Sequence, residues 1–160
     1  MFEQGVDKGY VHNNASYVVP YLIRRGNTLA AKLILHEQGA APELAGIFLQ
    51  TLASPDKSRP DAKAILDRYA PGKDTVFDQA IGRPQALMWL GAFELVGESD
   101  ELARNTEVAW MPGRVNWRNS PGFKRLLERT GVADYWRTHG FPTHCHALAG
   151  KDFVCDRVEP

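Results

Sequence analysis

Glycine and proline recur along this chain at the ends of short apolar-periodic segments, which limits each helix to about three turns. Gly26 and Gly39 each follow a segment whose apolar residues recur every three or four positions, and glycine commonly follows a helix end. Pro42 and Pro121 stand where helices would begin, because proline fits the first helical turn. The pattern predicts short helices, tight loops and antiparallel neighbours.

The individual helices can be placed from this periodicity. It predicts helices over residues 15–25, 28–38, 42–53, 60–70, 84–96, 120–130 and 134–138, with shorter ones after Thr75 and Ser99. Asn27 and Ser99 are expected to be N-caps, and Ser120-Pro121 to open a helix. Pro20 should lie in the first turn of its helix, and Leu29, Leu33 and Ile34 should form one apolar stripe.

No segment shows a convincing alternation of apolar and polar residues, so the predicted fold class is all-α, built from antiparallel helix pairs. Helix pairs in units of roughly 30 to 40 residues have the size of tetratricopeptide repeats. Identities between the units are sparse, which indicates degenerate, α-solenoid-like repeats. We expect a partly mobile leader over residues 1–14, a helical-repeat region over 15–105, and an irregular segment with capping helices and a loop over 106–160.

Charge and hydropathy narrow the function classes. Nineteen Lys and Arg against nineteen Asp and Glu give a net charge of +0, which disfavours nucleic acid as a partner. No apolar run has the roughly 20 residues of a membrane span, and no signal peptide is recognisable. The expected location is the cytoplasm, where Cys145 and Cys155 would stay reduced; a longer exported protein would place the chain in the periplasm.

The C-terminal part carries recognisable motifs: Trp110-Met111-Pro112, the run 118–127 (RNSPGFKRLL), the run 131–137 (GVADYWR), and then Gly140-Phe141-Pro142, Cys145, Asp152-Phe153 and Cys155. This segment resembles the closing part of tetratricopeptide-like helical regions that, in many bacteria, follow a winged-helix DNA-binding domain or a class III nucleotide cyclase domain. The resemblance implies a structural cap and a sensing or interaction region without its output module.

Two departures from that family stand out. Gly122 replaces a larger residue, and Thr143-His144 replaces an Asp-Phe pair beside the first cysteine. Neither bears on chemistry, because the family's segment is a cap. A terminal repeat needs such a cover for its apolar face, and Tyr135, Trp136, Phe141 and Phe153 are the residues expected to provide it.

Several clusters invite a chemical interpretation. His144, Cys145, His146 and Cys155, with His139, are metal-capable, yet three of them are contiguous, unlike paired zinc ligands. Cys145 with a histidine and Asp152 could form a nucleophile site, but sequence neighbours seldom face each other. Buried cysteines, or a disulfide closing a short loop in an exported protein, are the simpler interpretations.

Two further clusters also have simple structural explanations. The acidic residues Glu94, Glu98, Asp100 and Glu101 could form a paired-carboxylate site. Charges around a helix end are more often solvated, however, and the carboxylates at the start of the helix after Ser99 suit its dipole. Trp110, Arg114, Trp117 and Arg118 could be a basic-aromatic surface, although aromatic anchoring of the 106–119 segment fits the zero net charge better.

The function predicted from these observations is a non-enzymatic helical-repeat scaffold that binds a protein, a peptide or a second copy of the chain. No cofactor, nucleic acid or membrane is expected. The predicted binding surface is the set Tyr17, Tyr21, Phe48, Trp89 and Phe93. The alternatives are a small-molecule sensor with an apolar pocket walled by Trp89 and, third, a metal-dependent enzyme that uses the 144–155 loop.

Overall fold

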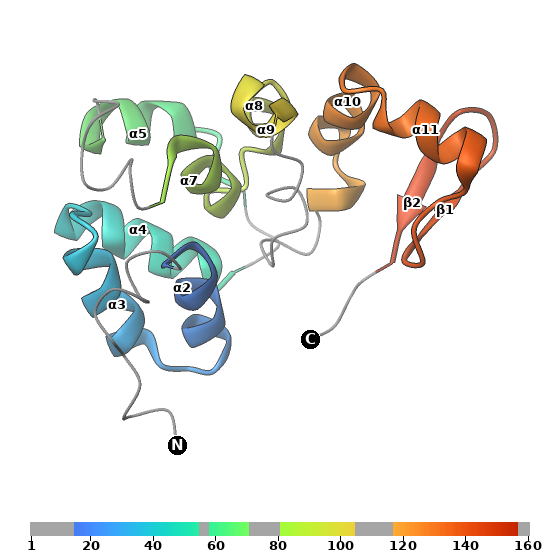
Figure 1. Ribbon diagram of the computed structural model, residues 1–160. Helices are drawn as coiled ribbons and strands as arrows, with labels where there is room; N and C mark the ends of the chain where they lie inside the picture. Colours follow the sequence, from blue (N-terminus) through green and yellow to red (C-terminus); the bar gives the residue numbers. More distant parts are fainter. Residues whose placement is uncertain (1–14, 55–57, 71–80, 105–116, 157–160) are drawn as a thin grey trace. The chain divides into compact units, whose positions relative to one another are not determined.

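The computed structural model describes residues 15–54, 58–70, 81–104 and 117–156 (Figure 1). The chain is mostly helical, with one small antiparallel sheet, and forms two compact units: unit 1, Met1–Ala92, and unit 2, Phe93–Pro160. The predicted boundary between residues 105 and 106 lies outside the described residues. The expected leader and the helix after Thr75 lie outside the described residues. Within the described ranges, no helix combines the length and the apolar character that crossing a membrane requires.

Unit 1 contains the helices α2 (Ala15–Arg24), α3 (Thr28–Glu37), α4 (Pro42–Leu52), α5 (Ala62–Tyr69) and α7 (Arg83–Trp89). Consecutive helices pack on one another: α2 on α3, α3 on α4, and α4 on α5. Contacts also join α2 to α4, and α7 to both α4 and α5 (Figure 1). The core between these helices includes Val19, Leu35, Leu44, Phe48 and Trp89, all fully buried.

The helix ends in unit 1 follow the predicted chemistry closely. The side chain of Asn27 accepts a hydrogen bond from the amide of Ala30 at 3.2 Å, which confirms it as the N-cap of α3. Gly39 adopts a left-handed φ of 78° after α3, and Pro42 lies at the start of α4. The prediction for Pro20 was wrong, because α2 begins at Ala15 and encloses this proline in its interior.

The predicted helix over residues 84–96 is also wrong, because the chain turns at Gly91. This glycine has a φ of 72°, and its amide donates to the Met88 carbonyl at 3.0 Å. The amide of Ala92 donates to the Leu87 carbonyl at 3.0 Å. These two bonds satisfy carbonyls at the C-terminus of α7 and end the helix, and α8 (Phe93–Gly97) begins two residues later.

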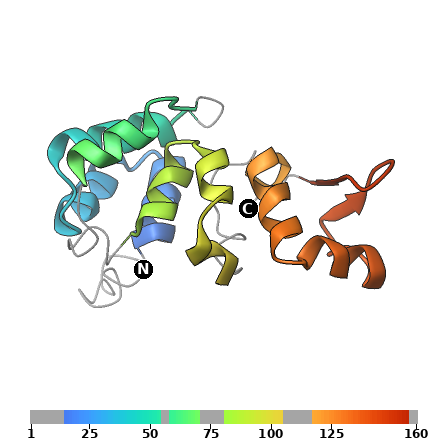
Figure 2. The same ribbon diagram turned by 90° about the horizontal axis from the view of Figure 1, so that it is seen from above.

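Unit 2 contains α8, α9 (Asp100–Arg104), the 3₁₀ helix η2 (Trp117–Asn119), α10 (Pro121–Arg129) and α11 (Val132–His139). Ser120 is the N-cap of α10, since its hydroxyl accepts from the amide of Phe123 at 3.2 Å. The all-α prediction missed two strands, β1 (Cys145–Ala147) and β2 (Phe153–Cys155), which form an antiparallel hairpin. Three residues per strand are too few to display an alternating pattern. In Figure 2 the hairpin lies in the angle between α10 and α11.

Aromatic rings form the centre of unit 2. Trp117 packs edge-on against Phe123 at a centroid distance of 5.3 Å, and Phe153 lies 6.4 Å from Phe123 and 5.7 Å from Trp136. Phe141 joins them from the loop before the hairpin, 5.9 Å from Trp136. Of the four aromatic residues expected to form a cover, Tyr135 is the exception, because its side chain is 60% exposed.

Two glycines allow α8 and α10 to approach each other at backbone distance. A Cβ atom placed on Gly97 would overlap the carbonyl oxygen of Gly122, and one placed on Gly122 would overlap the carbonyl oxygen of Phe93. Any other residue at either position would therefore force the two helices apart. Gly122, seen in the sequence only as a departure from the family that the C-terminal segment resembles, is a packing residue.

Candidate functional site

Some residues of the predicted binding surface are exposed in the structure, and others are buried in the core. Tyr17 and Tyr21, one turn apart on α2, are 38% and 44% exposed. Phe48 and Trp89 are 0% exposed and pack edge-to-face at 5.2 Å, so they belong to the core of unit 1. Phe93 belongs to unit 2, where it lies 5.7 Å from the Trp117 ring. The five residues therefore do not form one surface.

The most exposed large apolar side chains of unit 1 lie on α3 instead. Leu29 is 70% exposed and Leu33 is 56% exposed, so these two residues of the predicted apolar stripe are not part of the core. α3 packs through Ala31 and Leu35, which are fully buried on its opposite side. Helical geometry places Leu29, Lys32, Leu33 and His36 on one solvent-facing stripe, with spacings of three and four residues. We call these four residues the α3 ridge.

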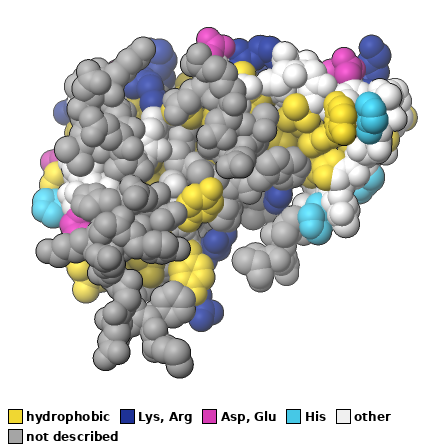
Figure 3. Space-filling model, in the orientation of Figure 1, with side chains coloured by type: hydrophobic (Ala, Val, Ile, Leu, Met, Phe, Trp, Pro, Cys, Tyr) yellow, Lys and Arg dark blue, Asp and Glu magenta, His cyan; other side chains and the backbone are white. Residues whose placement is uncertain are grey.

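The charge around the α3 ridge is mainly positive. Arg24, Arg25 and Lys32 are basic and exposed, and the segment from Ala15 to Glu37 holds one acid, the exposed Glu37 at the end of α3. Within the described part of the chain, none of these three cations forms an ion pair. Figure 3 shows hydrophobic side chains beside Lys and Arg on the surface over α2 and α3. The described residues of this face thus combine apolar anchors with an excess of positive charge.

The second predicted cluster, in unit 2, is organised by a disulfide. Cys145 and Cys155 lie directly opposite each other in the hairpin and are joined by an S–S bond of 2.07 Å. Neither sulfur is therefore available as a thiolate ligand or nucleophile, contrary to the metal and nucleophile interpretations. His144 and His146 are exposed at the edge of β1. Among the described residues, no three His, Cys, Asp or Glu side chains form a group that could hold a metal ion.

Polar contacts fix the hairpin to the helices of unit 2. The Asn119 side chain exchanges two hydrogen bonds with the backbone of Cys155, each 2.8 Å long, and so occupies the outer edge of β2. Arg137 donates to the Lys151 carbonyl at 2.7 Å and pairs with Glu128, which raises the pKa of this guanidinium above its usual value. The Lys124 ammonium, 2.6 Å from Asp152, lowers the pKa of that carboxyl.

Loss of the disulfide should weaken unit 2 selectively. The disulfide joins residues ten positions apart. The chain-entropy estimate for closing a loop of that length is about 2–3 kcal/mol of stability. We expect the double variant Cys145→Ala/Cys155→Ala to lose about that much in urea unfolding, with hydrogen exchange accelerated in unit 2 alone. Reductant should destabilise the wild type and leave the double variant unchanged. Two free thiols in the unreduced native protein would contradict the pairing.

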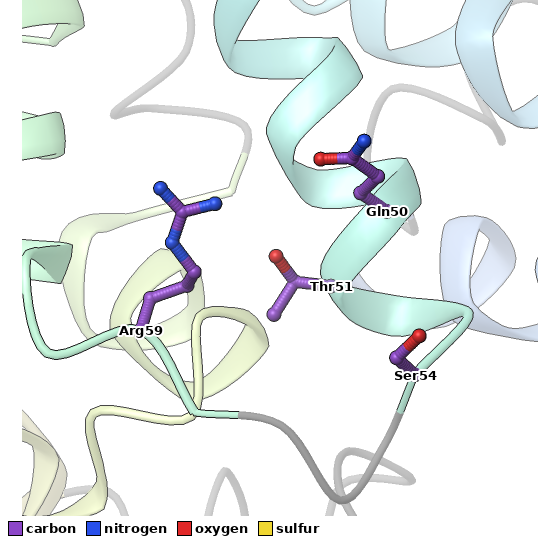
Figure 4. A pocket seen from close by; sticks show the side chains of 4 residues that line it. All are labelled: Gln50, Thr51, Ser54 and Arg59. Carbon is purple, nitrogen blue, oxygen red and sulfur yellow. The ribbon is translucent and has the colours of Figure 1, made fainter.

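A pocket of about 300 Å³ in unit 1 is lined by Gln50, Thr51, Ser54 and Arg59 (Figure 4). Gln50 and Thr51 come from the end of α4, and Arg59 reaches it from the segment before α5. The Arg59 guanidinium makes two 2.9 Å hydrogen bonds to Asp61, which lower the pKa of that carboxyl. The four residues that line this pocket do not include Trp89, so it is not the Trp89-walled pocket that the small-molecule alternative predicts, and they include no acid or histidine.

In the described part of the chain, three side chains of the acidic and basic-aromatic clusters make contacts that hold unit 2 together. Glu94 pairs with Arg125, and Asp100 pairs with Arg129 at 2.9 Å, so both carboxylates are engaged by α10. Trp117 is buried in the aromatic centre of unit 2, as the anchoring interpretation expects. Trp110, Arg114 and the side chain of Glu101 lie outside the described residues.

Comparison with known proteins gives no independent assignment: no protein-family model, no curated protein and no solved structure matches the chain. The candidate site therefore rests on geometry and charge. The sequence contained one signal for this site that the prediction of the binding surface did not use. The α3 segment carries Leu29 and Leu33 on one stripe and Ala31 and Leu35 on the other, so either stripe satisfies the helical period.

Proposed function

We propose that the chain is a non-enzymatic helical scaffold that binds a protein or peptide through the α3 ridge. The observation that carries this proposal is the exposure of Leu29 and Leu33, one helical turn apart on a helix whose opposite side is packed into the core. Exposed apolar side chains gathered on one helix face are typical of protein-interaction surfaces. Tyr17 and Tyr21 on α2 extend the apolar exposure to the neighbouring helix.

The scaffold is proposed to be a degenerate, tetratricopeptide-like stack of helix pairs. Supporting this, each of α2, α3 and α4 contacts the next, and α2 also contacts α4, as the helices of stacked pairs do. The C-terminal resemblance over residues 110–155 motivates the further proposal that the scaffold is the sensor or interaction part of a regulatory protein. The hairpin and α11 would then serve as its cap.

The proposal predicts that capture of a partner depends on the two leucines. In pull-downs from a lysate of the source organism, Leu29→Ala/Leu33→Ala should reduce recovery of specific partners at least tenfold. Its free energy of unfolding should change by less than about 0.5 kcal/mol per site, because both side chains are exposed in the free protein.

The matched control is Tyr135→Ala, which removes a similarly exposed side chain from unit 2 and should leave capture unchanged. Light scattering on the same samples tests whether the partner is a second copy of the chain. A dimer that dissociates in the leucine variant would show that the chain binds itself through the α3 ridge. An identical set of captured proteins with and without the two leucines would contradict the proposal.

A further inference from the structure

We infer that the partner of the α3 ridge is an acidic amphipathic helix, a conclusion that rests on the function proposed above. The inference concerns the chemistry of the partner and is carried by two independent properties of the ridge: the spacing of its leucines and the sign of its charge. Each property limits the occupant in a different way.

The spacing favours a helical partner of two to three turns. Leu29 and His36 are separated by seven residues, so the ridge is about 10 Å long at the helical rise. Leu29 and Leu33 are both exposed and lie one turn apart on the same side of α3. A partner helix with apolar residues at spacings of three, four and seven positions matches this pattern, as in other helix-recognition modes.

The charge favours a helix that is acidic beside its apolar stripe. Lys32 lies between the two leucines, and Arg24 and Arg25 lie at the end of α2 and in the turn before α3. From Ala15 to Glu37 these three basic residues outnumber one acid, Glu37, although the whole chain has equal numbers of acidic and basic residues. Asp and Glu on the partner would supply the ion pairs that the described residues do not provide for these cations.

Self-association through the ridge is disfavoured by the same charge. In a two-fold symmetric pair, the ridge would face its own copy, so two faces with a net positive charge would approach each other. A membrane surface fits less well than a helix, because two leucines are a small apolar face for interfacial binding. Light scattering detects self-association, and vesicle binding detects a membrane interaction.

The test compares three labelled synthetic peptides that share one leucine stripe and differ only in carrying Glu, Gln or Lys on the flanking positions. Binding to the full chain is followed by fluorescence anisotropy. We expect the Glu peptide to bind at least tenfold more tightly than the Lys peptide at low salt, and this ratio to shrink at about 0.5 M salt, where the screening length falls to a few Å. Lys32→Glu should reverse the order, while Lys151→Glu, the same change on the exposed hairpin of unit 2, should not.

The outcomes separate this inference from the proposed function. Equal binding of the three peptides that is lost in Leu29→Ala/Leu33→Ala overturns the acidic partner and leaves the scaffold proposal standing. Failure of all three peptides to bind also overturns the inference, and the leucine dependence of capture from lysate then decides the scaffold proposal separately. Leucine-dependent binding to phosphatidylserine vesicles without binding of the Glu peptide would assign the ridge to a membrane instead.

Discussion

Replacing Trp89 with alanine is expected to lower the free energy of unfolding of the protein by about 3–5 kcal/mol, the range for removing a large aromatic side chain from a core. The Trp89 side chain is fully buried and meets Phe48 edge-to-face, so its removal leaves a cavity that the neighbouring helices cannot fill without moving. Urea unfolding followed by circular dichroism gives the size of the loss. Hydrogen exchange should locate it in unit 1.

Tyr21→Ala is the control for Trp89, because both residues belong to the surface predicted from the sequence and only Tyr21 is exposed. Its free energy of unfolding should change by less than about 1 kcal/mol. The pair of variants therefore separates a core role from a binding role. A Trp89→Ala protein of wild-type stability that no longer captured partners would restore Trp89 to the binding surface.

The second large effect is expected at Gly122. In Gly122→Ala the new methyl group would collide with the backbone of Phe93, and a backbone atom cannot rotate away as a side chain can. We expect a loss of about 3 kcal/mol, at the upper end of the usual cost of overpacking, with faster hydrogen exchange in α8 and α10. Gly97→Ala should behave in the same way, because its methyl group would meet the backbone of Gly122.

Gly46→Ala provides the matched control for the glycine variants. Gly46 is exposed within α4, and a Cβ atom there would have no neighbour within 4 Å. The substitution should stabilise the protein by about 0.5–1 kcal/mol, the usual gain of alanine over glycine inside a helix. If Gly122→Ala were stabilising to the same extent, the close approach of α8 and α10 would be refuted.

Local signals allowed much of the helical framework to be predicted. Asn27, Pro42 and Ser120 act through hydrogen bonds or steric limits that involve residues within one helical turn. Such effects can be deduced without knowledge of the rest of the fold. Gly91 is also a local signal for a helix end. The strongly apolar sequence around it instead favours one continuous helix, which the left-handed conformation of Gly91 interrupts.

The parts that could not be predicted depend on contacts between distant residues. The proximity of Gly97 and Gly122 depends on how two helices pack, and the pairing of Asn119 with Cys155 joins residues 36 positions apart. The choice between the two stripes of α3 is of the same kind. Ala31 and Leu35 face the core because the small alanine allows a neighbouring helix to approach, which leaves Leu29 and Leu33 in solvent.

The disulfide has a practical consequence for the study of the α3 ridge. The chain contains two cysteines, and both sulfurs are buried in the hairpin bond, so the oxidised protein presents no reactive thiol. A cysteine introduced at the exposed position Thr28, beside the ridge, would be the single site that takes a maleimide dye. A change in the emission of this dye would report the binding of a partner helix in real time, and no native thiol would compete for the label.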